Sequence, residues 1–154
     1  MSNSNLKNHQ KVGVMFAGLG SVSSTLIAGV EAIKAGLSAP IGSQALTGRI
    51  PIEGVSCKIG DVLPLAALED IVFGGWDIFP DSAYDAAKKA KVLGPEVLEK
   101  VRGPLEKIRP TTAVFDPSAV RALKGTHVKT LANKREWVEA IRKELEKLVH
   151  EEVR

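Results

Sequence analysis

Residues 12–30 form an uncharged stretch between Lys11 and Glu31, and this stretch limits the possible fold more than any other part of the sequence. Its length is close to that needed to span a bilayer. However, four glycines and four hydroxyl residues interrupt it and gather near its middle, where a spanning helix needs large apolar side chains. A buried strand, a glycine-rich turn and an amphipathic helix explain the stretch better.

The first part of the stretch, KVGVMFA (residues 11–17), predicts a strand buried on both faces, as in a parallel sheet. After the turn, apolar residues recur three or four positions apart, which predicts the buried face of a helix of about fourteen residues that ends near a glycine. The residues of this face are Val22, Leu26, Val30, Ile33 and Leu37.

The turn between strand and helix reads GLGSVS (residues 18–23), at the place where a dinucleotide-binding motif belongs. Gly18 permits the tight turn, Gly20 lets the backbone approach a pyrophosphate, and the N–H groups that open the helix point at anionic oxygens. Ser23 replaces the third glycine of such motifs with another small residue, and Ser24 and Thr25 add further hydroxyl donors. The alternative is an ordinary glycine-rich turn that binds no ligand.

A dinucleotide motif also predicts an acidic residue about twenty positions later, to bind the ribose hydroxyls. No acidic residue lies between Glu31 and Glu53. The next predicted strand covers residues 70–76, and Asp77 follows at its carboxyl end. Asp77 is therefore the candidate for binding the ribose. It lies farther along the sequence than the motif predicts, because residues 38–68 are inserted before the second strand. The alternative is a turn aspartate that caps local backbone.

The remaining sequence is rich in helix signals. Glycines and prolines interrupt the insertion, where we expect one or two short strands around residues 48–55. Predicted helices cover residues 81–92 with Asp81 as N-cap, a segment from Pro95 to the break at Gly103–Pro104, and residues 116–125. Asn133 and Glu136 form a capping-box pattern at the start of the final helix.

The final helix carries an apolar stripe of Trp137, Ile141, Leu145 and Leu148. Such a stripe needs a sheet to cover it, and few strands are predicted. We therefore expect that the chain self-associates, as a homo-oligomer, or depends on a partner to cover the stripe.

Composition excludes several classes of protein. The 154 residues carry a net charge of +3 with both signs mixed, which argues against nucleic-acid binding, and we expect no membrane partner. One cysteine, Cys57, excludes an internal disulfide and a cysteine-based zinc site, no metal site is predicted, and the chain is expected to be cytoplasmic. Residues 1–10 form a polar tail without a signal-peptide pattern. Residues 11–154 are predicted to be an α/β, Rossmann-like domain that stops before its later strands.

Several blocks of the sequence resemble, in the same order, the prokaryotic branch of the inositol-3-phosphate synthase (myo-inositol-1-phosphate synthase) family. They are FAGLGSVSST (16–25), IAGVEAI (27–33), PIGS (40–43), DIVFGGWDI (70–78) with Asp81 and YDAA (84–87), TAVFD (112–116) and LKGTHVK (123–129). The GGWDI block is the most specific, because Gly-x-Gly turns occur in many folds.

The resemblance implies an NAD-dependent enzyme that converts D-glucose 6-phosphate to 1D-myo-inositol 3-phosphate, in inositol and phospholipid biosynthesis. In that family NAD oxidises C5 of the sugar, a proton leaves C6, an internal aldol step closes the ring, and NADH returns its hydride. By position, the cofactor-binding residues would be Asp77 at the adenosine ribose and, around the pyrophosphate, Gly18, Gly20, Ser21, Val22, Ser23 and Ser24. Ser43 and Gln44 would lie near the cofactor.

The family's catalytic lysines lie beyond residue 154, so the resemblance leaves the catalytic residues of this chain unknown. Lys129, Lys134, Lys143 and Lys147 are expected on a solvated face, and His127 is expected to be structural. Three functions stay open: the NAD-binding part of a synthase, an inert dinucleotide-binding module, and an interaction protein with an empty turn.

Overall fold

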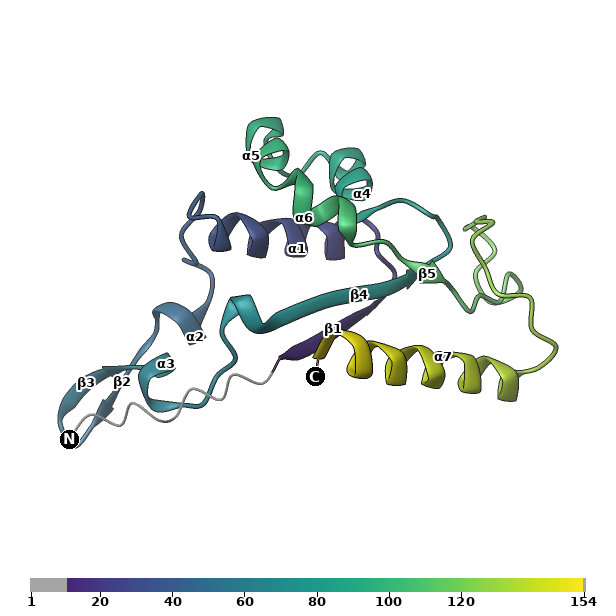
Figure 1. Cartoon of the computed structure of the whole chain (residues 1–154). Coiled ribbons are helices and arrows are strands. Elements are labelled where there is room, and N and C mark those ends of the chain that lie inside the picture. The colour runs from purple at the N-terminus through teal and green to yellow at the C-terminus, as the bar shows by residue number, and fades with distance from the viewer. Residues whose placement is uncertain (1–10, 154) are drawn as a thin grey trace.

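The computed structural model describes residues 11–153 as a parallel sheet between two layers of helices (Figure 1). Strand β1 (Val12–Ala17) pairs in parallel with β4 (Ile71–Asp77) over its whole length. Strand β5 (Thr111–Thr112) adds two residues on the other side of β4. In this order, β1-β4-β5, the outer edge of β1 pairs with no other described strand. The predicted α/β class with a parallel sheet is confirmed, whereas the tail at residues 1–10 lies outside the described residues.

The helices divide between the two faces of the sheet. One layer holds α1 (Ser21–Lys34), α4 (Ala83–Ala90), α5 (Pro95–Lys100) and α6 (Arg102–Lys107), and the other holds α7 (Lys134–Leu148), which continues into the π-helical turn η2 (Val149–Val153) (Figure 1). The uncharged stretch is split into β1, a turn and α1, as predicted. Within residues 11–153, no helix combines the length and apolarity that crossing a bilayer requires.

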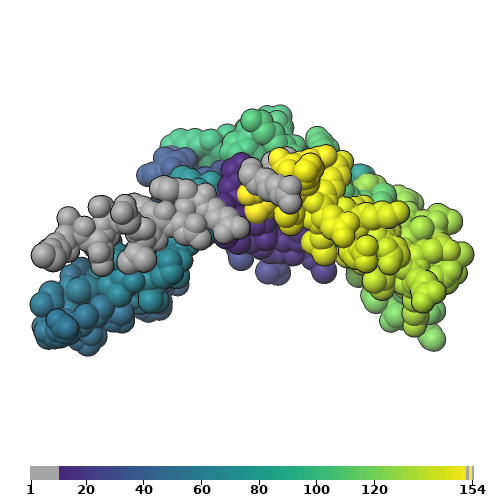
Figure 2. All heavy atoms as spheres, turned by 60° about the horizontal axis from the view of Figure 1, so that its bottom comes forward, coloured from purple at the N-terminus to yellow at the C-terminus, as the bar shows by residue number. Residues whose placement is uncertain are grey.

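The insertion between α1 and β4 forms an arm, residues 38–70, that extends away from the sheet (Figures 1 and 2). It contains a hairpin of two antiparallel strands, β2 (Arg49–Ile52) and β3 (Val55–Lys58). Both residues of the hairpin turn, Glu53 and Gly54, have positive φ, which suits a two-residue turn. The rest of the arm holds the short helices α2 (Gln44–Thr47), α3 (Ile59–Val62) and η1 (Leu68–Asp70). The predicted short strands are confirmed, and no residue of the arm is fully buried.

The main core lies between α1, α4, α5, α6 and the sheet. The face that α1 buries is made of small residues around one isoleucine: Ser23, Ser24, Ile27, Ala28 and Ala32. The predicted helix length is right, but the predicted buried face is wrong, since Val22 is 82% exposed and Leu26 is 49% exposed. Small side chains let α1 approach α4 and the sheet closely, and the larger apolar residues then fall on the opposite side of the helix.

The final helix packs against the other face of the sheet. A Cβ on Gly13 would lie 3.1 Å from both Leu148 and Val153, so this glycine leaves room for the end of α7 and η2 against β1. Leu148 also lies beside Gly74 of β4, where an added Cβ would be in ordinary contact with it at 3.9 Å. The expectation that the stripe on α7 lacks a covering sheet is therefore wrong for Leu148. Leu145 of the same stripe remains 40% exposed.

Several local predictions are corrected. The N-cap of α4 is Ser82, while Asp81 pairs with Lys89 at 2.5 Å, and α4 ends at Ala90, before Val92. Gly103 and Pro104 lie inside the first turn of α6, where proline is tolerated because that N–H needs no partner within the helix. Residues 116–125 form turns with no helix.

Two other local features concern residues 111–136. Strand β5 was not predicted, because two residues carry too short a pattern. The capping role of Asn133 is confirmed: its side chain accepts hydrogen bonds from the N–H groups of Arg135 and Glu136. Glu136 reaches back to the N–H of Ala132, one residue earlier than a capping box requires.

We predict that Ser82→Ala lowers the free energy of unfolding by about 1 kcal/mol, the usual cost of losing an N-cap. The fully buried Ser82 hydroxyl accepts from the Asp85 N–H at 3.1 Å and donates to the Asp85 carboxylate at 2.7 Å. That hydrogen bond is the main cause of a lowered pKa at Asp85. Because the pKa of Asp85 is lower in the folded protein than its ordinary value of 3.8, its carboxylate stabilises the fold at any pH above 3.8. This contribution is lost as the pH falls through the lowered pKa.

Denaturant titrations between about pH 7 and pH 2 would measure both effects. Ser82→Ala should be less stable at neutral pH and should lose less stability on acidification than the wild type. Ser38→Ala, at an exposed position, is the control. Equal stability and equal acid sensitivity of Ser82→Ala and Ser38→Ala would contradict the prediction.

Candidate functional site

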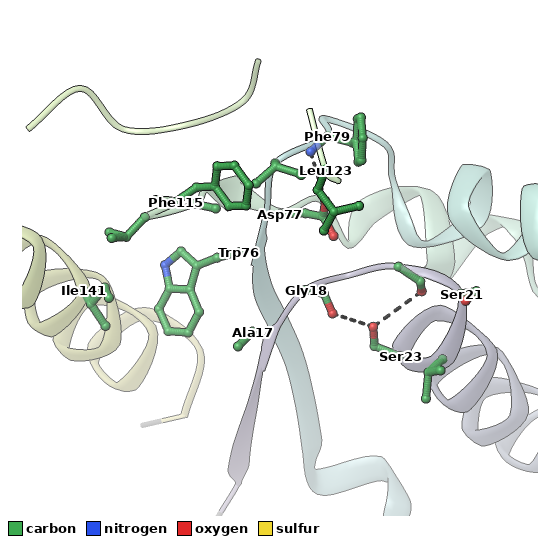
Figure 3. Close-up of a pocket in the computed structure, with 15 residues that line it drawn as sticks. Ala17, Gly18, Ser21, Ser23, Trp76, Asp77, Phe79, Phe115, Leu123 and Ile141 are labelled. Carbon is green, nitrogen blue, oxygen red and sulfur yellow. Dashed lines mark hydrogen bonds between the residues drawn. The ribbon is translucent and has the colours of Figure 1, made fainter. Parts of the chain in front are cut away.

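A cavity of about 590 Å³ lies at the carboxyl ends of the three parallel strands. It is bounded by the turn after β1, the first turn of α1, the end of β4, the segment after β5, and one side chain each from the 116–125 turns and α7. Ligands of parallel α/β sheets bind at this edge, because the turns that follow the strands meet there. In Figure 3, Gly18, Ser21 and Ser23 lie on one side of the cavity and Trp76, Phe115 and Ile141 on the other.

The glycine-rich turn is tied to the end of β4. The Gly18 N–H donates to the Trp76 carbonyl at 2.8 Å, and Gly18 has φ +111°, which favours glycine. The Ser23 hydroxyl donates to the Gly18 carbonyl at 2.6 Å, as the dashed line in Figure 3 shows. The Leu19 side chain points into the core, where it is 2% exposed. The turn is therefore fixed to the end of β4 and to the core, and its remaining side borders the cavity.

The first turn of α1 presents N–H groups without a protein cap. Gly20 is the N-cap residue and offers no side chain, and no acidic residue lies in this turn. The first bond within the helix runs from the Ser24 N–H to the Gly20 carbonyl at 3.0 Å. The N–H groups before it, those of Ser21, Val22 and Ser23, precede the hydrogen-bonded helix, and all three residues line the cavity. A helix start of this kind attracts an anion.

Gly20 supplies the test of whether a dinucleotide fits. Its φ of −78° and ψ of −155° are open to any residue, and a Cβ built on it would meet no protein atom within 4 Å. The fold itself therefore does not require glycine at this position. Because Gly20 lines the cavity, a side chain there would occupy the space that a pyrophosphate needs. The turn fits the group that its sequence predicts.

Asp77 connects the two halves of the site. Its Oδ2 accepts from the Leu19 N–H at 2.6 Å, and its Oδ1 accepts from the Phe79 N–H at 2.9 Å. The contact with Phe79 is the local backbone cap that the alternative interpretation predicts, whereas the contact with Leu19 joins residues 58 positions apart in the sequence. The carboxylate also lines the cavity, and each oxygen retains a lone pair for a further donor. Among the described residues that line the cavity, Asp77 is the only ionisable one.

The outer wall of the cavity is apolar. It combines Trp76 and Phe79 around the end of β4, Phe115 after β5, Leu123, and Ile141 of α7. Sequence reasoning identified none of these five as site residues, although Trp76 belongs to the GGWDI block. The TAVFD block was the available signal for Phe115, whereas Leu123 and Ile141 reach the site only through tertiary packing.

The segment that carries Leu123 is held against β4 by backbone contacts. A Cβ on Gly125 would lie 2.4 Å from the Ile78 carbonyl oxygen, so only glycine allows this approach. The His127 N–H donates to the same carbonyl at 2.9 Å, and the His127 carbonyl accepts from the Ala113 N–H at 3.0 Å. These bonds agree with the structural role expected of His127.

Lys129 does not lie on a solvated face, contrary to expectation. It is 11% exposed in its side chain and forms an ion pair with Glu144 of α7 at 2.8 Å. Its Nζ also donates to the carbonyl and hydroxyl of Thr112. Lys134, Lys143 and Lys147 are exposed, as expected.

Other expected site residues lie away from the cavity. Ser24 is fully buried, and its hydroxyl donates to the Ser21 carbonyl at 3.3 Å. Ser43 caps α2 and Gln44 begins it, both on the arm. Among residues 11–153, no group of three or more His, Cys, Asp or Glu residues is arranged to hold a metal ion.

A parallel sheet with a glycine-rich turn, an uncapped helix start and a carboxylate at the next strand end defines the class of dinucleotide-binding α/β domains. Comparison with known proteins then narrows this class. The family model of an NAD-binding domain described as myo-inositol-1-phosphate synthase matches residues 12–152.

Individual relatives agree with the family model. Inositol-3-phosphate synthase 1 of Bacteroides thetaiotaomicron is 44% identical over 137 residues, which are 88% of this chain and 32% of the relative. Inositol-3-phosphate synthase isozyme 1 of Arabidopsis thaliana is 33% identical over 88% of this chain and 30% of its own length. The crystal structure of inositol-3-phosphate synthase from Caenorhabditis elegans superposes with a TM-score of 0.80 at 25% identity, over 92% of this chain and 32% of that one.

The chain belongs to the myo-inositol-1-phosphate synthase family, and its matched region is the NAD-binding domain. It spans about a third of the length of the relatives that it matches.

Proposed function

We propose that this chain is the NAD-binding part of an inositol-3-phosphate synthase, which converts D-glucose 6-phosphate to 1D-myo-inositol 3-phosphate. The observation that carries the proposal is the open space around Gly20. The fold does not require glycine at this position, but close approach of a pyrophosphate to the backbone does. The relatives are named for this activity. A cytoplasmic location is part of the same proposal and rests on the single cysteine.

The roles of the site residues follow from their places around the cavity. The N–H groups of Ser21, Val22 and Ser23, at the positive end of α1, would hold the pyrophosphate. Gly18 and Gly20 would allow its close approach. The free lone pairs of the Asp77 carboxylate would accept from the adenosine ribose hydroxyls. Ser24 would act indirectly, because its buried hydroxyl holds the Ser21 carbonyl.

NAD, when bound, supplies the hydride acceptor and donor of the reaction. This chain's part is to bind and orient the cofactor. The proton removal and ring closure need acid and base groups, and within the described lining the only ionisable side chain, Asp77, is occupied by two backbone N–H groups. Catalysis would therefore depend on residues outside these 154.

We predict that Gly20→Val weakens NAD binding at least tenfold and leaves the fold intact. A Cβ at position 20 meets no protein atom within 4 Å, so the free energy of unfolding should fall only by the cost of a poorer N-cap residue, about 1 kcal/mol. Calorimetric titration with NAD, together with a thermal melt of each variant, measures both quantities.

The matched control is Gly42→Val, at a position equally open to solvent but on the arm. It should bind NAD like the wild type. Equal heats of NAD binding for Gly20→Val and the wild type would contradict the assignment of the glycine-rich turn to the pyrophosphate.

We also predict that the purified chain alone does not convert glucose 6-phosphate to inositol phosphate. Nuclear magnetic resonance of the reaction mixture with NAD present would detect the product, and the Bacteroides thetaiotaomicron relative named above is the positive control. Turnover by the 154 residues would contradict our account of where the catalytic groups lie.

A further part of the proposal concerns association. The outer edge of β1 pairs with no described strand, and Leu26 on α1 is 49% exposed outside the cavity lining. Parallel sheets are covered by helices on both faces, and an unpaired strand edge offers free backbone groups to a further chain segment. We propose that another copy or the remaining part of the enzyme covers these groups.

Sedimentation of the isolated chain should therefore show reversible self-association. Leu26→Glu, which charges the exposed stripe outside the cavity, should shift the equilibrium toward monomer. A wild-type chain that stays monomeric at high concentration would exclude association through this surface.

A further inference from the structure

The Trp76 indole lines the cavity and is also hydrogen-bonded to α7. Successive side chains of a strand point to opposite faces, so Trp76 shares the α7 face of β4 with Gly74. Its Nε1 donates to the Oε2 of Glu144 on α7 at 2.6 Å. The indole therefore bridges the sheet and α7 while its ring borders the cavity, as Figure 3 shows.

Glu144 is itself fixed by a second partner. Its Oε1 pairs with the Lys129 Nζ at 2.8 Å, and Lys129 donates in turn to Thr112 at the end of β5. The other ion pairs of α7, such as Arg142–Glu146 at 3.2 Å, lie on its exposed side. The Lys129–Glu144 pair is partly buried, with 11% and 26% of the two side chains exposed, and desolvation of such a pair offsets much of its attraction. Its main effect here is geometric, since both carboxylate oxygens are committed.

The position of the indole relative to the other site residues identifies what it borders. In the proposed function, the turn after β1 would hold the phosphates and Asp77 at the end of β4 would bind the ribose. Beyond Asp77, toward β5, the wall consists of Trp76, Phe115 and Ile141, without a charged group among the described lining residues. A flat heteroaromatic base fits such a wall, because bases stack favourably on aromatic side chains.

We propose that Glu144, held by Lys129, is a positioning residue that fixes the Trp76 indole as the wall of the adenine pocket. The inference rests on the proposed function. Ordering a side chain in advance reduces the entropy cost of binding. Loss of the Glu144 acceptor for the indole N–H should therefore weaken binding of an adenine-containing ligand by about three- to tenfold.

The test uses the 154-residue chain with Trp137→Phe, which leaves Trp76 as the only tryptophan. Removing Glu144 alone would leave the Lys129 charge buried, so the informative variant is the double change Lys129→Met with Glu144→Met, which fills similar volume. Glu144→Gln keeps an acceptor for the indole N–H. The matched control is Arg142→Ala with Glu146→Ala, an exposed pair on the same helix.

Two readouts are measured: acrylamide quenching of Trp76 without ligand, and the Kd of ADP-ribose and of inorganic pyrophosphate by calorimetry. In the double variant we expect faster quenching and a three- to tenfold higher Kd for ADP-ribose, with the Kd of pyrophosphate unchanged. Glu144→Gln and the control pair should behave like the parent chain.

An unchanged ADP-ribose Kd in the double variant would overturn the inference while leaving the proposed function intact. An equal loss for pyrophosphate would also overturn it, since the change would then not concern the base. If the parent chain binds neither ligand, the proposed function fails first, and the inference fails with it.

Discussion

The hydrogen bond from the Leu19 N–H to the Asp77 carboxylate is the contact on which the site depends. It joins the turn after β1 to the end of β4, two segments that are 58 positions apart in the sequence. The parallel register, with Ala17 opposite Trp76, brings these ends level. The Gly18 N–H donates to the Trp76 carbonyl and the Leu19 N–H donates to the Asp77 carboxylate, and these two hydrogen bonds fix the position of the turn. The turn thereby sets the direction in which the first N–H groups of α1 point.

Close packing of the two helix layers on the sheet follows from small residues. On one side, the serines and alanines of α1 admit α4. On the other, Gly13 leaves room for Leu148 of α7. This second contact matters for the cavity, because α7 places Ile141 in its lining and Glu144 against the Trp76 indole. The cavity is thus built partly by a helix that begins more than fifty residues after β4 ends.

The described residues form a three-stranded parallel sheet in which β1 is an edge strand. The sheets of dinucleotide-binding folds consist of two halves. The matched relatives are about three times longer than this chain. The free edge of β1 and the exposed stripe of α1 lie where a second half would continue the sheet.

The sequence by itself determined the strand–turn–helix unit, the glycine-rich turn, the second parallel strand ending in Asp77, and the family. These features are local, because glycine positions and short apolar runs carry their own backbone preferences. The buried face of α1, the covering of α7, the burial of Lys129 and the apolar wall from Phe115, Leu123 and Ile141 were decided only by the tertiary structure. Periodicity shows that a helix has an apolar side, but which side is buried depends on which neighbour can approach, and here the small residues allowed the closer contact.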